Sequence, residues 1–297
     1  MERVLTLVAP RPGGLTADIV AEAGHALNGL GADIGVAIWL APQQAADIPF
    51  AGTDRRTAEM AVNGVLDRHP LDVLASRQAG RRKRLLLADM DATIVTSETL
   101  DELAAHAGLK DSIAAITQKA MNGELDFDAA VKERVAMLAG LPETMLEKTY
   151  GDTVLTAGAA TMVRTMRAAG AHCVLVSGGF KYFTSRIAED CGFHENHANQ
   201  LEIVDGRLSG KVIEPIFGKE AKLHTLQRLS GELGLDRLQT LAVGDGANDL
   251  PMIEAAGLGV AFHGKPVVAA AAPARVEHGD LTTLLYYQGF RRDEFVN

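Results

Sequence analysis

Apolar runs without polar alternation constrain the fold of this chain most strongly. They occupy residues 85–88, 173–176, 240–243 and 257–262. A strand buried on both faces has this pattern, because neither face meets water. Helical stretches separate the runs, at 159–169, 182–190, 221–233 and 250–256. Strands that alternate with helices predict a parallel sheet with right-handed crossovers, that is, an α/β fold with a three-layer, Rossmann-like core.

Two further segments are expected to decorate this core. The interval between the first two runs is too long for a simple loop, and its apolar residues recur at helical spacing. It predicts a helical cap at about 98–152. Residues 199–208 alternate around an Asp205-Gly206 turn, which predicts a β-hairpin.

The N-terminal 80 residues form a separate pattern. We expect strands at 4–8, 34–40 and 71–74, a helix capped by Thr16 and a second helix over 53–66. This order suits a ferredoxin-like α+β sandwich and resembles, in pattern only, the small ACT-type amino-acid-sensing modules. The basic run 81–84 is interpreted as a solvated linker, so the predicted domains are 1–80 and 81–297.

Composition excludes several classes of function. The net charge of -9 disfavours nucleic-acid binding, and no run of about 18 apolar residues predicts a membrane span. Only 2 cysteines occur, which fits a reducing compartment and a cytoplasmic protein. Cys191 with His194 and His197 falls short of the ligand set of a tetrahedral zinc site.

Polar residues follow every run except the last. Run 85–88 leads into Asp89-Met90-Asp91-Ala92-Thr93, run 173–176 into Ser177-Gly178-Gly179, and run 240–243 into 244–249, with the sequence Gly-Asp-Gly-Ala-Asn-Asp. Open parallel sheets bind ligands beyond the carboxyl ends of their strands, so these groups are expected to meet. A lysine at a helix start, Lys219 or Lys222, lies between the last two clusters; we favour Lys222.

These groups suit phosphate chemistry. Converging carboxylates repel one another unless a cation such as Mg²⁺, which prefers oxygen ligands, lies between them. Ser177, the backbone N–H of Gly178 and a lysine can bind the oxygens of a phosphate monoester. One of the paired residues Asp89 and Asp91 can attack phosphorus, and the other can protonate the leaving group.

In order and spacing, the four motifs resemble those of the haloacid dehalogenase superfamily, phosphatase branch, over about residues 84–265. The resemblance implies Asp89 as the nucleophile and Asp91 as the general acid/base. It also implies an Mg²⁺ site made by Asp89, the Asp91 carbonyl and Asp245, supported by Asp249. Ser177 and Lys222 would hold the phosphoryl oxygens.

Within that superfamily the chain most resembles the phosphoserine phosphatases. The resemblance implies that Glu98 binds the ammonium and Arg134 the carboxylate of phosphoserine, which suits a zwitterion. It also implies substrate contacts from Asn248 and supporting positions for Phe127 and Met121. Ala92 departs from the family, where many members carry Ser.

The expected reaction is magnesium-dependent hydrolysis of O-phospho-L-serine, the last step of serine biosynthesis. Two alternatives stay open: a phosphatase or phosphotransferase for another small phosphomonoester, and a regulatory amino-acid-binding protein. Because modules of the N-terminal type can mediate self-association, a homodimer is also allowed for.

Overall fold

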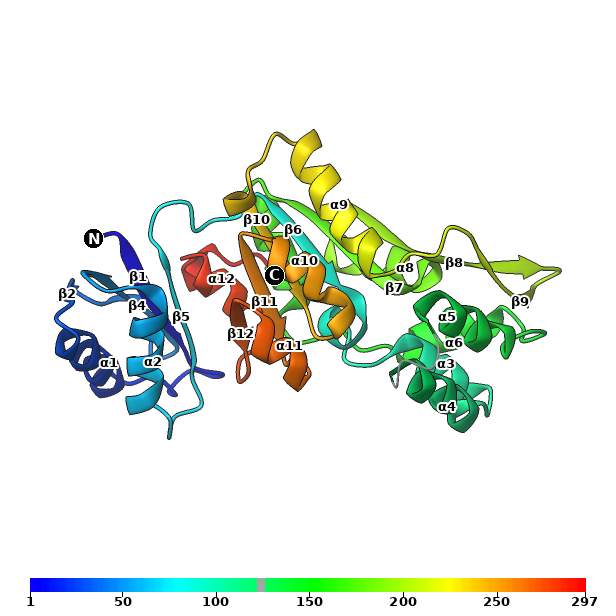
Figure 1. Ribbon diagram of the computed structural model, residues 1–297, viewed down its shortest axis with the longest axis horizontal. Helices are drawn as coiled ribbons and strands as arrows, with labels where there is room; N and C mark the ends of the chain where they lie inside the picture. The colour runs from blue at the N-terminus through cyan, green and yellow to red at the C-terminus, as the bar shows by residue number, and fades with distance from the viewer. Residues whose placement is uncertain (122–125) are drawn as a thin grey trace.

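The computed structural model describes residues 1–121 and 126–297 and contains two separate β-sheets joined by a linker (Figure 1). The first sheet has the order β2-β4-β1-β5, with β3 also paired to β4, and the pairings among these strands are antiparallel. Its elements are β1 (Arg3–Val8), α1 (Ala17–Gly29), β2 (Asp33–Ile34), β3 (Ile38–Ala41), β4 (Ala45–Ala51), α2 (Arg55–Val65) and β5 (Asp72–Arg77).

Both predicted helices of this unit are present, and each is capped by a side chain. Thr16 accepts a hydrogen bond from the amide of Ile19, and Asp54 accepts one from the amide of Thr57. The prediction of one strand at 34–40 was wrong, because the structure has two short strands there, β2 and β3. Strand β4 was not predicted, since Pro49 lies inside it and proline is unusual within a sheet.

The second sheet has the order β12-β11-β10-β6-β7-β8-β9, and the four predicted apolar runs lie in β6, β7, β10 and β11. Its strands pair in parallel except for the β8–β9 hairpin. The bounds are β6 (Leu85–Asp89), β7 (His172–Phe180), β8 (Glu195–Val204), β9 (Arg207–Ile213), β10 (Thr240–Gly244), β11 (Leu258–Phe262) and β12 (Ala274–Val276).

Helices cover both faces of this sheet. Leu85 and Leu87 pack with Leu226 and Met252 on one face, whereas Leu86 packs in the cluster of the opposite face. Successive residues of a strand point to opposite faces, so a run buried on both sides must be apolar throughout. The helices are α7 (Ala159–Ala168), α8 (Lys181–Cys191), α9 (Lys219–Glu232), α10 (Leu250–Ala255), α11 (Pro266–Ala271) and α12 (Thr283–Tyr287).

Of the helices between β6 and β7, the four that precede α7 lie beyond one end of the sheet (Figure 1). They are α3 (Thr99–His106), α4 (Lys110–Met121), α5 (Phe127–Ala136) and α6 (Thr144–Asp152). We call this group the cap. The β8–β9 hairpin runs alongside it: Gly140 donates to the Leu208 carbonyl (2.8 Å), and the Leu208 amide donates to Leu141 (2.9 Å).

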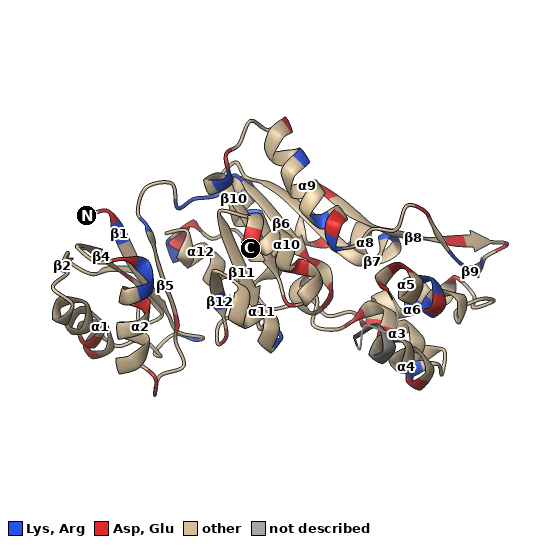
Figure 2. Cartoon of the chain, viewed as in Figure 1, with Lys and Arg blue, Asp and Glu red and all other residues tan. Residues whose placement is uncertain are grey.

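The basic linker is only partly the solvated segment that its charge predicts: Arg82 and Arg84 are exposed, whereas Arg81 is not. Figure 2 marks its basic residues between β5 and β6. The Arg81 side chain is only 10% exposed, and it donates to Asp47 and Thr6 of the first sheet and to the carbonyl oxygens of Tyr286 and Tyr287. Arg81 therefore joins the N-terminal unit to α12.

Asp72 makes a second polar connection between the two sheets. Its buried carboxylate accepts hydrogen bonds from the amides of Glu277 (2.7 Å), His278 (3.2 Å) and Gly279 (2.7 Å). Burial raises the pKa of Asp72, and these backbone donors act against that rise.

No helix in the described parts of the chain, 1–121 and 126–297, combines the length and apolarity that a bilayer crossing requires.

Candidate active site

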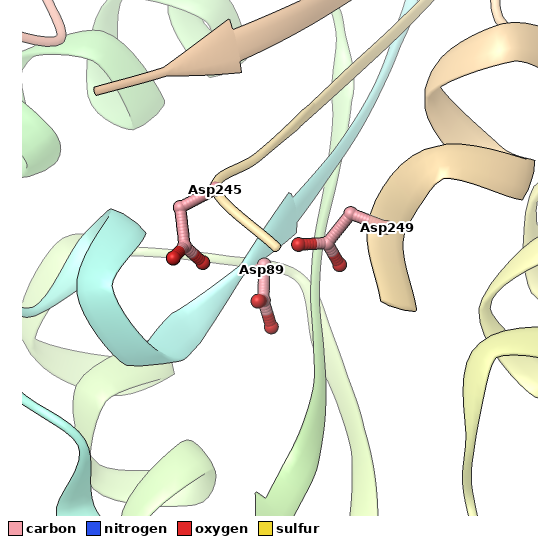
Figure 3. Close-up of side chains that lie close together, drawn as sticks. All are labelled: Asp89, Asp245 and Asp249. Atoms are coloured by element: carbon pink, nitrogen blue, oxygen red, sulfur yellow. The ribbon is translucent and has the colours of Figure 1, made fainter. Parts of the chain in front are cut away.

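The polar clusters at the ends of β6, β7 and β10 meet at one edge of the second sheet. Asp89 ends β6, Asp245 follows β10, and Asp249 precedes α10. Each offers a carboxylate oxygen, and these oxygens lie within 4.8 Å of one another (Figure 3). All three residues are buried.

Lys222 partly neutralises this acidic group. Its fully buried ammonium donates to Oδ1 of Asp89 and to Oδ1 of Asp249, at 2.7 Å each. Burial acts to lower the pKa of Lys222, but the Asp249 and Asp89 carboxylates outweigh it and raise that pKa, so the lysine stays charged. Lys219, the alternative, lies at the surface with a side chain 56% exposed.

Three buried carboxylates with one buried lysine leave negative charge uncompensated. Burial, followed by repulsion from Asp249, raises the pKa of Asp89, and Lys222 acts in the opposite direction. The donor set is made of oxygen atoms, which hard divalent cations prefer. The acidic group therefore fits a divalent metal ion in both charge and ligand type.

The side chain of Asp91 is held by Thr99 and Ser177. Its Oδ1 accepts hydrogen bonds from the amide and hydroxyl of Thr99 (2.8 Å each), and its Oδ2 accepts one from the Ser177 hydroxyl (3.1 Å). Burial raises the pKa of Asp91 despite these donors, which favours its protonated form. Thr99, which holds this carboxyl group, was not predicted from the sequence.

The last part of β7 has room only for glycine beside Asp91. The Ser177 hydroxyl accepts a hydrogen bond from the amide of Gly179 (2.8 Å). A Cβ at Gly179 would lie 2.9 Å from Asp91 Oδ2, closer than real Cβ contacts. In the cap, the Phe127 ring lies against Gly178 and Gly218, since a Cβ at either would meet the ring at 3.3 and 3.0 Å.

A cavity of about 370 Å³ opens between this edge of the sheet and the cap. Its lining includes the predicted residues Asp89, Asp91, Glu98, Phe127, Arg134, Ser177, Gly178, Asp245 and Asn248. Lys222 and Asp249 are fully buried next to Asp89. Met121 ends α4, and its side chain lies outside the described part of the structure.

Lys265 also lines the cavity and was missed in the sequence. Its ammonium lies 3.3 Å from Asp245 Oδ2 and 3.8 Å from Glu98 Oε1. Lys265 follows β11, so the prediction that no polar residues follow the last apolar run was wrong. The Glu98 side chain is 51% exposed. Desolvation, followed by repulsion from Asp91, nevertheless raises the pKa of Glu98 to about 7, and the positive charge of Lys265 acts to lower it.

Arg134 supplies the opposite charge on the cap side. It lies on α5, and its Nε donates to the Ala130 carbonyl (3.2 Å). Burial lowers the pKa of Arg134, while Asp101 and Glu98 act to raise it.

A larger cleft, about 810 Å³, lies between the two sheets. Its lining contains Arg56, His69 and His278 and, among the described residues, none of the predicted site.

A family model described as haloacid dehalogenase-like hydrolase matches residues 86–254, and the chain belongs to this family. A phosphoserine phosphatase of Streptomyces coelicolor is 40% identical over 98% of this chain and 72% of its own length. A crystal structure of a probable phosphoserine phosphatase from Vibrio cholerae has a TM-score of 0.79 at 29% identity, covering 99% of this chain and 88% of that one. A substrate-bound phosphoserine phosphatase complex has a TM-score of 0.65 at 36% identity, covering 69% of this chain and 98% of that one.

Proposed function

We propose that this chain hydrolyses O-phospho-L-serine to L-serine and phosphate. The observation that carries the proposal is one cavity that contains two sets of polar groups. Asp89, Asp91 and Ser177 lie together in it, and the same cavity contains Glu98 and Arg134, which carry opposite charges. An amino acid with a phosphorylated side chain needs both sets of partners. The named relatives support the same substrate.

In the first step, a carboxylate oxygen of Asp89 attacks phosphorus, and the bond from phosphorus to the serine oxygen breaks. Asp91 gives its proton to the leaving oxygen, so serine departs as the neutral alcohol. The raised pKa of Asp91 favours the protonated form that this step requires. Ser177 and Lys222 hold the phosphoryl oxygens during the transfer.

In the second step, water attacks the phosphorus of the aspartyl-phosphate. Asp91, now ionised, takes a proton from that water, and the bond from Asp89 to phosphorus breaks. Phosphate leaves, and both aspartates return to their starting states.

We propose Mg²⁺ as the metal ion, held by Asp89, Asp245 and the backbone carbonyl of Asp91. Asp249 would support these ligands through Lys222 and through the Gly246 amide, which donates to it at 3.1 Å. When bound, Mg²⁺ would neutralise the carboxylates and withdraw charge from the phosphoryl oxygens.

Recognition of the serine part is assigned to the cap side of the cavity. Glu98 binds the ammonium group and Arg134 clamps the carboxylate, because a guanidinium can donate two parallel hydrogen bonds. Asn248 lines the cavity near the phosphoryl end, and Phe127 closes it against Gly178 and Gly218.

For the rest of the chain, we propose residues 1–80 as an ACT-like module and 81–297 as the phosphatase domain, with the helical cap at about 98–152. The order β2-β4-β1-β5 with two helices supports a ferredoxin-like arrangement of the module. We further propose a cytoplasmic enzyme that completes serine biosynthesis, with a homodimer as the assembly to test.

The test is phosphate release from a panel of phosphomonoesters, assayed with Mg²⁺ and with a chelator. Phosphoserine should be the best substrate by kcat/KM, ahead of phosphothreonine, sugar phosphates and para-nitrophenyl phosphate, and the chelator should abolish turnover. Asp89→Asn should remove activity on every substrate, because an amide is a poor nucleophile. A sugar phosphate that outperformed phosphoserine would refute the substrate assignment.

A further inference from the structure

Asn199, on β8, has a buried side chain that takes no part in the proposed chemistry. It connects two segments of the chain that belong to the proposed phosphoryl site. It is 1% exposed. Its Nδ2 donates hydrogen bonds to the carbonyl oxygens of Gly178 (2.8 Å) and Phe217 (3.1 Å), and its Oδ1 accepts one from the amide of Phe217 (2.6 Å). Both N–H donors and the carbonyl of the amide are therefore engaged.

Both partners belong to segments that bind the phosphoryl group in the proposed function. Gly178 follows Ser177 in the last part of β7. Phe217 leads into α9, where the amide of Lys222 donates to the Gly218 carbonyl (3.1 Å). Asn199 therefore spans from the serine side of the phosphoryl site to the lysine side.

Regular sheet pairing does not hold the last part of β7 at this point. The pairing of β7 with β8 shifts register between Val176 and Phe180, so the regular ladder is interrupted over residues 177–179. Asn199 is opposite Phe180, where β8 leaves β7, and Gln200 begins the pairing with β9. A side chain that bonds to the backbone replaces the missing ladder contacts here.

We infer that Asn199 is a positioning residue for phosphoryl transfer: it sets the distance between the Ser177–Gly178 segment at the end of β7 and the start of α9 without touching the substrate. This inference rests on the proposed function. An asparagine is required because the two carbonyl oxygens need donors and the amide of Phe217 needs an acceptor. Aspartate would place a second acceptor against both carbonyl oxygens, and alanine would leave three partly buried backbone groups without this partner.

Asn199→Ala in the full chain with Mg²⁺ tests the inference, with Asn199→Ser as a milder variant that keeps one hydroxyl. The matched control is Asn196→Ala on the same strand, whose Oδ1 accepts from Thr184 Oγ1 (2.8 Å) on α8 and not from the Ser177–Gly178 segment or the start of α9. We measure kcat and KM for phosphoserine and para-nitrophenyl phosphate, together with binding of inorganic phosphate by calorimetry. Circular dichroism sets a temperature at which every variant is folded.

Loss of alignment of the order of 1 Å can cost about 10²-fold in rate, so Asn199→Ala should lower kcat by about that factor. The loss should be equal for both substrates, phosphate binding should weaken at least ~10-fold, and Asn199→Ser should lie between the wild type and Asn199→Ala. Asn196→Ala should keep wild-type kcat and phosphate binding.

Two results would overturn the inference: values for folded Asn199 variants that match those of Asn196→Ala, or a loss confined to phosphoserine. A wild type that hydrolysed neither substrate would instead refute the proposed function. Phosphate binding would then still decide the role of Asn199, because it needs no turnover. If Asn199→Ala did not fold, the same comparison would be made with Asn199→Ser.

Discussion

Lys222 donates a 2.7 Å hydrogen bond to Asp89 across 133 residues of sequence, and the two side chains are 0% and 6% exposed. A buried charge without a partner is strongly unfavourable, so each of these groups depends on the other. The same lysine also donates to Asp249, so it pairs with two of the three buried carboxylates.

Lys222→Met should therefore impair both activity and stability. Breaking a buried ion pair costs about 3–5 kcal/mol, and the phosphoryl oxygens would lose a cation. Denaturant unfolding and phosphate release check the two effects. Lys219→Met, three residues earlier on the same helix but exposed, should be close to wild type in both. If the two substitutions had equal effects on activity and stability, the proposed role of Lys222 in the site would be contradicted.

Asp91→Asn should lower kcat by about 10²–10⁴-fold, the usual contribution of a positioned acid and base. Its proposed metal contact is a backbone carbonyl, so the affinity for Mg²⁺ should change little. Calorimetric titration of Mg²⁺ into the variant checks the second point. Full activity in Asp91→Asn would contradict the acid/base role.

The pKa of Glu98, raised to about 7, predicts a pH dependence of substrate recognition. Above this value Glu98 is ionised and attracts the ammonium of phosphoserine; below it the side chain is neutral and the attraction is lost. The ratio of kcat/KM between wild type and Glu98→Gln should therefore fall as pH drops through about 7. Using this ratio at each pH cancels the ionisation of the substrate itself. A ratio constant with pH would contradict the role of Glu98.

The Asp47–Arg81 pair should matter for stability and not for chemistry. Asp47→Ala leaves Arg81 buried without its carboxylate, which should cost about 3–5 kcal/mol of unfolding free energy. Glu22→Ala breaks the exposed Arg68–Glu22 pair and should cost about 0–1 kcal/mol. Chemical denaturation compares the two variants, and kcat of the folded protein should be unchanged in both. A loss of kcat in Asp47→Ala would mean that the N-terminal module acts on the site.

The parallel sheet and the meeting of polar clusters at its edge could be predicted from sequence, because strands buried on both faces leave continuous apolar runs. Other features left no local signal. Arg81 appeared to be one member of an exposed basic run, since its partner Asp47 is 34 residues away and its carbonyl partners are over 200 residues away. Strand β4 was not predicted, because it contains Pro49. Lys265 was not predicted, because it follows β11, whose end carries no carboxylate motif.

Substrate selectivity tests the central claim most directly, by comparing kcat/KM for phosphoserine and para-nitrophenyl phosphate in wild type and Arg134→Ala. Loss of the partner of a bound carboxylate should cost about 2–5 kcal/mol for phosphoserine and much less for the substrate that lacks this group. Lys132→Ala, on the same helix but 53% exposed, should leave both values unchanged. A uniform loss on both substrates in Arg134→Ala would contradict the assignment of phosphoserine as the substrate.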